Sequence, residues 1–397
     1  KEISTTISLS RKWIPDKKHS TKKPREHQIK ALENWVKNNR KGILEHATGS
    51  GKTYTAICAI RDALDRGQTV LVLVPSKELL YQWREEIRQN ITDIKLDFLL
   101  CGDGNNTWRT ENLLTLWTRP NSTLNKITIA VMDTASDEKF ISRVVSGSHL
   151  LLVADEVHRI GSRKRRNILK IDAGERLGLS ATPVRYGDPE GTAAVFDYFD
   201  GIVAPVFTLE DAIKSEVLTR YYYYPQKVHL LPDEQNKWND VTKKINRLMA
   251  ILRSKNVPFK AMMATSPKLQ MLLINRARIV KQAYNKINLA LGVIEKHYEP
   301  GQKWIVYCDN QGQLSDVLKL LLKNGYDAYE YFSEMQGDRV QTLKYFESNG
   351  GILVSIRCLD EGVDIPSTTH ALILASSKNP REFIQRRGRI LRKYPGK

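Results

Sequence analysis

Short apolar runs alternate with amphipathic segments along most of the chain. Continuous runs of Val, Leu and Ile that end at polar loops lie near residues 42–45, 69–74, 127–131 and 150–154. Such runs are typical of parallel strands that are buried on both faces. Between them, segments such as 53–66 and 79–89 carry apolar residues at helical spacing. The alternation predicts an α/β domain in which helices cover a parallel sheet.

The same alternation returns nearer the C-terminus and predicts a second α/β unit. Its strand-like runs lie at residues 304–307, 351–355 and 371–375. Residues 233–298 lack strand signals and mix basic with apolar side chains, which predicts a mainly helical insertion. We therefore expect four parts: a basic arm at 1–23, a first α/β domain at 24–205, a linker with the helical insertion at 206–300, and a second, truncated α/β domain at 301–397.

A run of four tyrosines lies in the predicted linker, at residues 221–224. Consecutive aromatic residues alternate faces on a strand, so the run favours a partly buried edge or linker strand. The alternative is a platform on which bases of a nucleic acid stack.

The composition adds a strong charge signal. Lys and Arg number 62 against 44 Asp and Glu, a net charge of +18 that favours a polyanionic partner. A membrane surface is the rival partner, but no apolar run reaches the roughly 20 residues of a spanning helix. The four cysteines lie far apart without a CxxC pair, so neither a zinc site nor a disulfide framework is indicated. We expect a cytoplasmic protein.

The segment HATGSGKT at 46–53 follows a predicted strand and opens a predicted helix, the context that makes a phosphate-binding loop credible. In such a loop, glycines turn backbone N–H groups inward around phosphate oxygens, and the helix N-terminus adds its dipole. Lys52 supplies charge to the β- and γ-phosphates of ATP, and the Thr53 hydroxyl can ligate Mg²⁺. The expected nucleotide contacts are Thr48, Gly49, Ser50, Gly51, Lys52 and Thr53. His46 departs from the pattern, which has glycine there.

Two adjacent carboxylates, Asp155 and Glu156, end another apolar strand-like run. A carboxylate pair in such a place needs a cation, and Mg²⁺ provides one. Asp155 would hold the ion through water, and Glu156 would polarise the attacking water. The alternative is a simple helix cap. Upstream, Arg25 and Gln28 are candidates for reading adenine, because a glutamine amide both donates and accepts.

Near the C-terminus, Arg389 and Arg392 share one face if their segment is helical. Guanidinium groups match phosphate oxygens bidentately and keep their charge, so these arginines are candidates for contacting the γ-phosphate. The alternatives are a solvated basic helix and a direct contact with nucleic acid. A further basic run, 163–166, is interpreted as a solvated loop in preference to a DNA-binding patch.

With these motifs in order, the chain resembles the superfamily 2 helicases and translocases of the DExH type, whose fold is two RecA-like P-loop NTPase domains. The resemblance covers residues 24–392. It implies a role for the residues of each motif. Arg25 and Gln28 would read adenine, and 49–53 would bind phosphate and Mg²⁺. His158, Ser180 and Thr182 would couple hydrolysis to domain closure. The remaining roles are nucleotide contacts by Gly362 and Asp364 and transition-state contacts by Gln385, Arg389 and Arg392.

The resemblance also implies a nucleic-acid partner. Ser76, Lys77, Thr134 and Arg357 match positions at which the family contacts the strand backbone. Within the superfamily the sequence is most similar to the group of XPB, RadD and the type I and III restriction motors, so we expect an ATP-dependent DNA helicase or translocase, with protein partners from a defence or repair complex. The alternatives are an RNA helicase or RNA-sensing ATPase, and an ATP-gated clamp or scaffold that does not travel.

Overall fold

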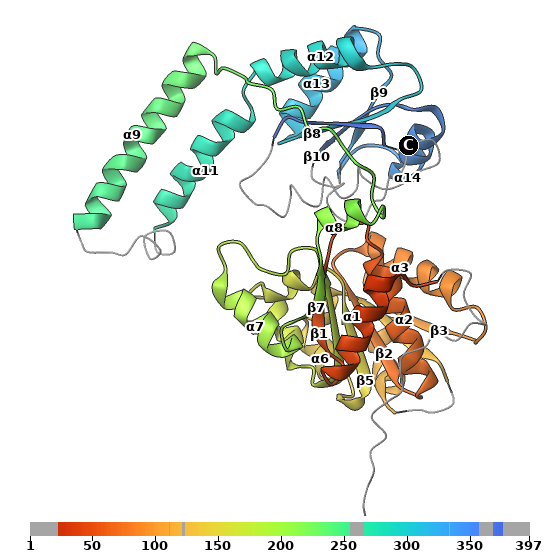
Figure 1. Cartoon of the computed structure of the whole chain (residues 1–397). Helices are drawn as coiled ribbons and strands as arrows, with labels where there is room; N and C mark the ends of the chain where they lie inside the picture. The colour runs from red at the N-terminus through yellow and green to blue at the C-terminus, as the bar shows by residue number, and fades with distance from the viewer. Residues whose placement is uncertain are drawn as a thin grey trace, which may run out of the picture. The chain divides into compact units, whose positions relative to one another are not determined.

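The computed structural model describes residues 23–110, 112–120, 124–254, 266–332, 334–356 and 368–375. The chain divides into two compact units at residues 219 and 220. Each unit contains one sheet, and the paired strands within each sheet run parallel (Figure 1). The predicted fold class is confirmed: two α/β units, each with a parallel sheet, and a mainly helical segment between the two sheets in the sequence. No described helix is both long enough and apolar enough to cross a membrane.

The sheet of the first unit has seven strands in the order β3-β4-β2-β5-β6-β1-β7. The strands are β1 (Lys41–His46), β2 (Thr69–Val74), β3 (Asp97–Cys101), β4 (Lys126–Val131), β5 (Gly147–Ala154), β6 (Ala173–Ser180) and β7 (Ile202–Phe207). Because the strands are parallel, their carboxyl ends meet at one edge of the sheet, where ligands of open α/β sheets bind.

Helices cover both faces of this sheet. They are α1 (Glu26–Lys37), α2 (Lys52–Asp65), α3 (Lys77–Asn90), α4 (Leu113–Thr118), α5 (Met132–Ala135), α6 (Glu138–Ile141), α7 (Pro189–Phe199), α8 (Leu209–Lys214) and the 3₁₀ helices η1 (Thr107–Arg109), η2 (Val157–Gly161) and η3 (Arg165–Lys170). Residues of β2 alternate between two cores: Val72 packs with Trp35 and Trp83, and Leu73 packs with Phe140 on the other face. Burial on both faces explains why β2 is apolar at every position after Thr69.

The second unit holds a four-stranded sheet in the order β11-β8-β10-β9. Its strands are β8 (Lys303–Cys308), β9 (Ala328–Tyr331), β10 (Gly351–Ile356) and β11 (His370–Ile373), and its helices are α9 (Pro232–Ser254), α11 (Pro267–Lys281), α12 (Asn285–His297), α13 (Gln311–Lys323) and α14 (Arg339–Asn349). The core joins Val306 and Val354 to Leu321 of α13 and Ile294 of α12.

The segment predicted to be a helical insertion forms α9, α11 and α12. Helices α9 and α11 pack against each other through a small core around Ile245 and Leu269. Most of the other apolar side chains of this pair are only partly buried. The packing of α9 against α11 therefore rests on few buried side chains.

The structure differs from two of the expectations drawn from the sequence. The edge strand expected at 221–224 is wrong: these residues lie outside any strand, and Tyr222 and Tyr224 are 86% and 75% exposed. The predicted boundary at residue 205 falls inside β7, and the chain beyond it packs back on the first unit through Ala212 and Leu218. The four-part division otherwise stays a prediction.

Candidate active site

The loop between β1 and α2 has the backbone of a phosphate-binding loop. Gly49 and Gly51 adopt φ angles of 83° and 92°, a left-handed conformation that L side chains rarely take. A Cβ at Gly51 would lie 2.7 Å from Nε2 of Gln28, so no larger residue fits there. The loop thus needs glycine for conformation and for space.

Two hydroxyl side chains of this loop are buried without hydrogen-bond partners among the described residues. Ser50 is fully buried and Thr48 is 9% exposed, and within the described part of the chain the hydroxyl oxygens of both have no hydrogen-bond partner. Buried polar groups are rarely left unsatisfied unless a ligand or water completes them. The Lys52 ammonium donates to the carbonyls of His46 and Ala47, at 3.0 and 3.2 Å. This combination of donors fits a bound phosphate chain.

The two residues expected to read adenine contact the loop itself. Gln28 is 2% exposed; its Oε1 accepts from the Arg25 amide at 2.8 Å, and its Nε2 donates to the Gly51 carbonyl at 2.9 Å. The Arg25 guanidinium donates to the Ser50 carbonyl at 3.3 Å. The structure therefore places both side chains against the phosphate loop, and their contact with adenine stays a prediction.

His46, which replaces the first glycine of the pattern, packs the loop against β7. It is fully buried, and its Nε2 lies 3.1 Å from the carbonyl of Pro205. The ring of His27 stacks on Phe207 at 3.8 Å and lies edge-on to His46 at 5.5 Å. Burial, together with His27 and Lys52 nearby, lowers the pKa of His46 to about 3. His46 is therefore a neutral packing residue at physiological pH.

This buried histidine should make the first unit sensitive to acid. The folded pKa of about 3 lies below the ordinary 6.5, so between these values the unfolded chain binds a proton that the folded chain does not. The free energy of unfolding therefore has its full value, as far as His46 is concerned, above pH 6.5. It decreases as the pH falls towards 3. We expect about 2 kcal/mol of unfolding free energy to disappear between pH 7 and 5.

Urea unfolding at several pH values measures this effect. His46→Gln, which does not titrate, should be less stable at pH 7 but should show a flatter dependence on pH. Parallel stability curves for the two proteins would contradict the assignment of the acid sensitivity to His46.

The carboxylate pair follows β5, at the same edge of the sheet as the phosphate loop. Asp155 is held by two donors: Nε1 of Trp83 lies 3.0 Å from one carboxylate oxygen, and the Glu156 amide lies 2.9 Å from the other. Glu156 adopts φ 44° and ψ 50°, which is left-handed and uncommon for a residue with a side chain. Such backbone strain persists only where the surroundings enforce it, and it gathers at functional sites.

The structure brings the expected coupling residues together. His158 is 2% exposed, and its Nδ1 lies 3.0 Å from Oγ of Ser180 and 3.5 Å from a carboxylate oxygen of Glu156. The Ser180 oxygen also accepts from the Thr182 amide at 3.1 Å. One chain of contacts thus runs from Glu156 through His158 to the 180–182 loop.

Three candidates for nucleic-acid contact lie at the carboxyl ends of the neighbouring strands β2 and β4. Ser76 precedes α3, and its hydroxyl is buried without a hydrogen-bond partner among the described residues. Lys77 has a side chain 60% exposed, 3.7 Å from the carboxylate of Asp103. A Cβ built on Gly102 would lie 3.3 Å from Oγ1 of Thr134. The loop after β3 thus borders both Lys77 and Thr134.

The basic run 163–166 was interpreted as a solvated loop, and for two of its members this is wrong. Arg165 forms two hydrogen bonds with the Asp133 carboxylate, at 2.8 and 2.9 Å. Arg166 donates to the Gly161 carbonyl at 2.8 Å and pairs with Glu190. Asp133 and Glu190 are distant from these arginines in the sequence, so no local pattern identifies the two ion pairs.

The other site predictions lie outside the described residues. They concern Arg357, Gly362, Asp364, Gln385, Arg389 and Arg392. Within the described residues, no group of three or more His, Cys, Asp or Glu side chains is placed to hold a metal ion. The Mg²⁺ site expected at Thr53 and Asp155 uses one hydroxyl and one carboxylate, and Mg²⁺ commonly takes its remaining ligands from phosphates and water.

Two family models match the chain. One is described as the type III restriction enzyme res subunit and matches residues 21–185; the other is the helicase conserved C-terminal domain and matches residues 285–394. The DNA 3'-5' translocase XPB2 of Sulfurisphaera tokodaii is 24% identical over 93% of this chain and 78% of its own length. The chain spans half or less of the length of two other curated relatives.

Two solved structures are similar in fold. One is the ATP-dependent type ISP restriction-modification enzyme LlaBIII bound to DNA, with a TM-score of 0.61 and 17% identity over 95% of this chain and 27% of that one. The other is the helicase domain of Hef from Pyrococcus furiosus, with a TM-score of 0.51 and 17% identity over 92% of this chain and 93% of that one.

Proposed function

This chain belongs to the superfamily 2 helicases, in the group of XPB and the restriction motors, and on that basis we propose that it is an ATP-hydrolysing DNA translocase or helicase. The observation that carries the proposal is the phosphate-binding loop at the same sheet edge as the strained Glu156. Two buried hydroxyls of this loop have no partner among the residues that the structure describes. A loop of this kind binds a phosphate chain, and a carboxylate beside it can act on water.

In this proposal the residues of the site have different tasks. The loop amides and Lys52 bind the phosphates of ATP, and Arg25 and Gln28 set the position of the loop and read adenine. Thr53 and Asp155 would hold Mg²⁺, which neutralises phosphate charge when bound. Glu156 polarises the attacking water. Gln385, Arg389 and Arg392 would stabilise the transition state, with Gly362 and Asp364 beside the nucleotide.

The partner in this proposal is DNA. The net charge of +18 favours a polyanion, and the similar XPB2 protein is named a DNA translocase. Ser76, Lys77, Thr134 and Arg357 would contact the sugar-phosphate backbone, which positions a strand without reading its sequence. Protein partners in a defence or repair complex and a cytoplasmic location remain part of the proposal.

ATPase activity measured without polymer, with single-stranded DNA, with duplex DNA and with duplex RNA tests the function. We expect duplex DNA to stimulate hydrolysis more than duplex RNA does. Stronger stimulation by RNA would favour the RNA-helicase alternative. ATP-dependent binding to DNA without movement in single-molecule tracking would favour the clamp.

The contact of Lys77 with the strand is tested by salt dependence. Lys77→Ala removes one phosphate contact, so we expect the plot of log affinity for DNA against log salt to become shallower by about 0.7 to 0.9. Lys170→Ala is the matched control, because its side chain is 59% exposed and also lies 3.7 Å from a carboxylate. Lys170 precedes β6, at the opposite edge of the sheet. Equal slopes for Lys77→Ala and the wild type would remove Lys77 from the interface.

A further inference from the structure

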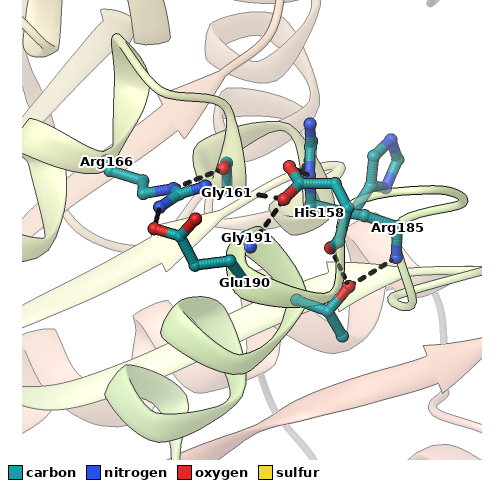
Figure 2. A network of polar contacts seen from close by, with 8 residues as sticks. His158, Gly161, Arg166, Arg185, Glu190 and Gly191 are labelled. Carbon is teal, nitrogen blue, oxygen red and sulfur yellow. Dashed lines mark hydrogen bonds and ion pairs between the residues drawn. The ribbon is translucent and has the colours of Figure 1, made fainter. Parts of the chain in front are cut away.

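The turn that follows Glu156 is held by two arginines from other parts of the first unit (Figure 2). Arg185 donates to the carbonyl of His158 at 2.5 Å, and Arg166 donates to the carbonyl of Gly161 at 2.8 Å. Both acceptors belong to the 3₁₀ turn η2. Two backbone carbonyls of this short turn are therefore fixed by charged donors, which make stronger hydrogen bonds than neutral ones do.

Asp188 joins the two arginines. One of its carboxylate oxygens lies 2.8 Å from Nε of Arg185, and the other lies 3.5 Å from a terminal nitrogen of Arg166. The second oxygen also accepts from the Gly191 amide at 2.8 Å and so caps α7. The guanidinium groups are thereby anchored to a helix.

The backbones of the turn and of α7 also touch directly. A Cβ at Gly161 would lie 2.5 Å from the carbonyl oxygen of Gly191, and a Cβ at Gly191 would lie 2.4 Å from that of Gly161. Only a pair of glycines permits this approach without displacement. Helix α7 therefore supports the turn through a contact that tolerates little movement.

Arg185 also belongs to the segment that carries Ser180 and Thr182. It lies three residues after Thr182, and Ser180 reaches the same turn through His158. We propose that Arg185, anchored on Asp188, is a positioning residue for ATP hydrolysis: it fixes the turn that keeps Glu156 in its left-handed conformation and links that turn to the 180–182 loop. This role rests on the proposed ATPase function and extends it to residues outside the sequence motifs.

Conservative replacement of Arg185 tests the role. Arg185→Lys keeps the charge but loses the fork that reaches His158 and Asp188 together. Because a small misplacement of a catalytic group can cost about 10²-fold, we expect kcat to fall by about 10- to 100-fold, with the Kd for a fluorescent ATP analogue unchanged within about 2-fold. Added guanidinium ion should partly restore hydrolysis in Arg185→Ala, at concentrations that leave the wild type folded.

Arg176 is the matched control. Its guanidinium also donates to two backbone carbonyls, of Ala173 and Tyr198, and pairs with Asp172, and its side chain is 13% exposed against 19% for Arg185. Arg176→Lys should lower the melting temperature at least as much as Arg185→Lys and leave kcat near the wild-type value.

Equal effects of the two lysine variants on kcat, or a fall in kcat that simply follows melting temperature, would overturn the positioning role. Normal turnover in Arg185→Lys would overturn it as well. Wild-type protein that binds the ATP analogue but never hydrolyses ATP would instead remove the proposed function, and the positioning role with it. The same set of measurements therefore distinguishes a failure of the positioning role from a failure of the proposed function.

Discussion

ATP hydrolysis should fall by about 10²- to 10⁴-fold when Glu156 is replaced by glutamine, while ATP stays bound. Glutamine has the size of glutamate and leaves the Asp155 contacts with Trp83 and with the backbone unchanged. It lacks the negative charge that polarises water, so the loss should appear in kcat and not in affinity. Single-turnover hydrolysis and titration with a fluorescent ATP analogue measure the two quantities separately.

Glu216→Gln is a matched control for the backbone effect. Glu216 also has a positive φ, of 54°, but it is exposed and follows α8. It should hydrolyse ATP at the wild-type rate. Hydrolysis near the wild-type rate in Glu156→Gln would mean that another group acts on the water and that Glu156 has a structural task.

Lys52→Ala should abolish both ATP turnover and tight ATP binding. The ammonium group of Lys52 lies within hydrogen-bond distance of the His46 and Ala47 carbonyls. Without it, the β- and γ-phosphates would meet these carbonyl dipoles with no opposing charge. We expect the Kd for ATP to rise by at least about 10-fold, a change of roughly 1.4 kcal/mol, and hydrolysis to fall to background.

Lys41→Ala provides the comparison, since Lys41 begins β1, at the end of that strand that lies away from the phosphate loop. It should bind and hydrolyse ATP as the wild type does. Tight binding of ATP by Lys52→Ala would show that the lysine serves only to close the loop, and the phosphate site would then have to be placed elsewhere.

The sequence predicted β2, β4 and β5 from their largely apolar runs, and it did not predict β3, β6, β7 or β9. Strand β6 was missed because Glu175 and Arg176 interrupt its apolar pattern. In the structure, Glu175 is 7% exposed and pairs with Arg66 and Arg40 from elsewhere in the chain. Strand β7 contains Pro205, which lacks an amide donor and is tolerated because β7 lies at the edge of the sheet.

Part of the candidate site could also be predicted from the sequence, and part could not. The phosphate loop was predictable because its glycines, Lys52 and Thr53 lie within a few residues and follow a local geometric rule. The ion pairs of Arg185 and Arg166 with Asp188 were not predictable. These arginines act on the turn η2 only because η2 packs against the start of α7 in the folded chain. Sequence spacing reports contacts along one helix or loop, whereas the support of Glu156 comes from contacts between separate elements.

The packing of His46 and its neighbours decides where a minimal nucleotide-binding fragment can end. The Ala47 amide donates to the Phe207 carbonyl at 2.7 Å, and Ala47 is buried with Phe207, Ala212 and Leu218. A fragment cut at residue 205 would lose this cover and leave one wall of the phosphate loop in water. Expression of the first lobe alone, or its exchange between related motors, therefore requires a junction after Leu218.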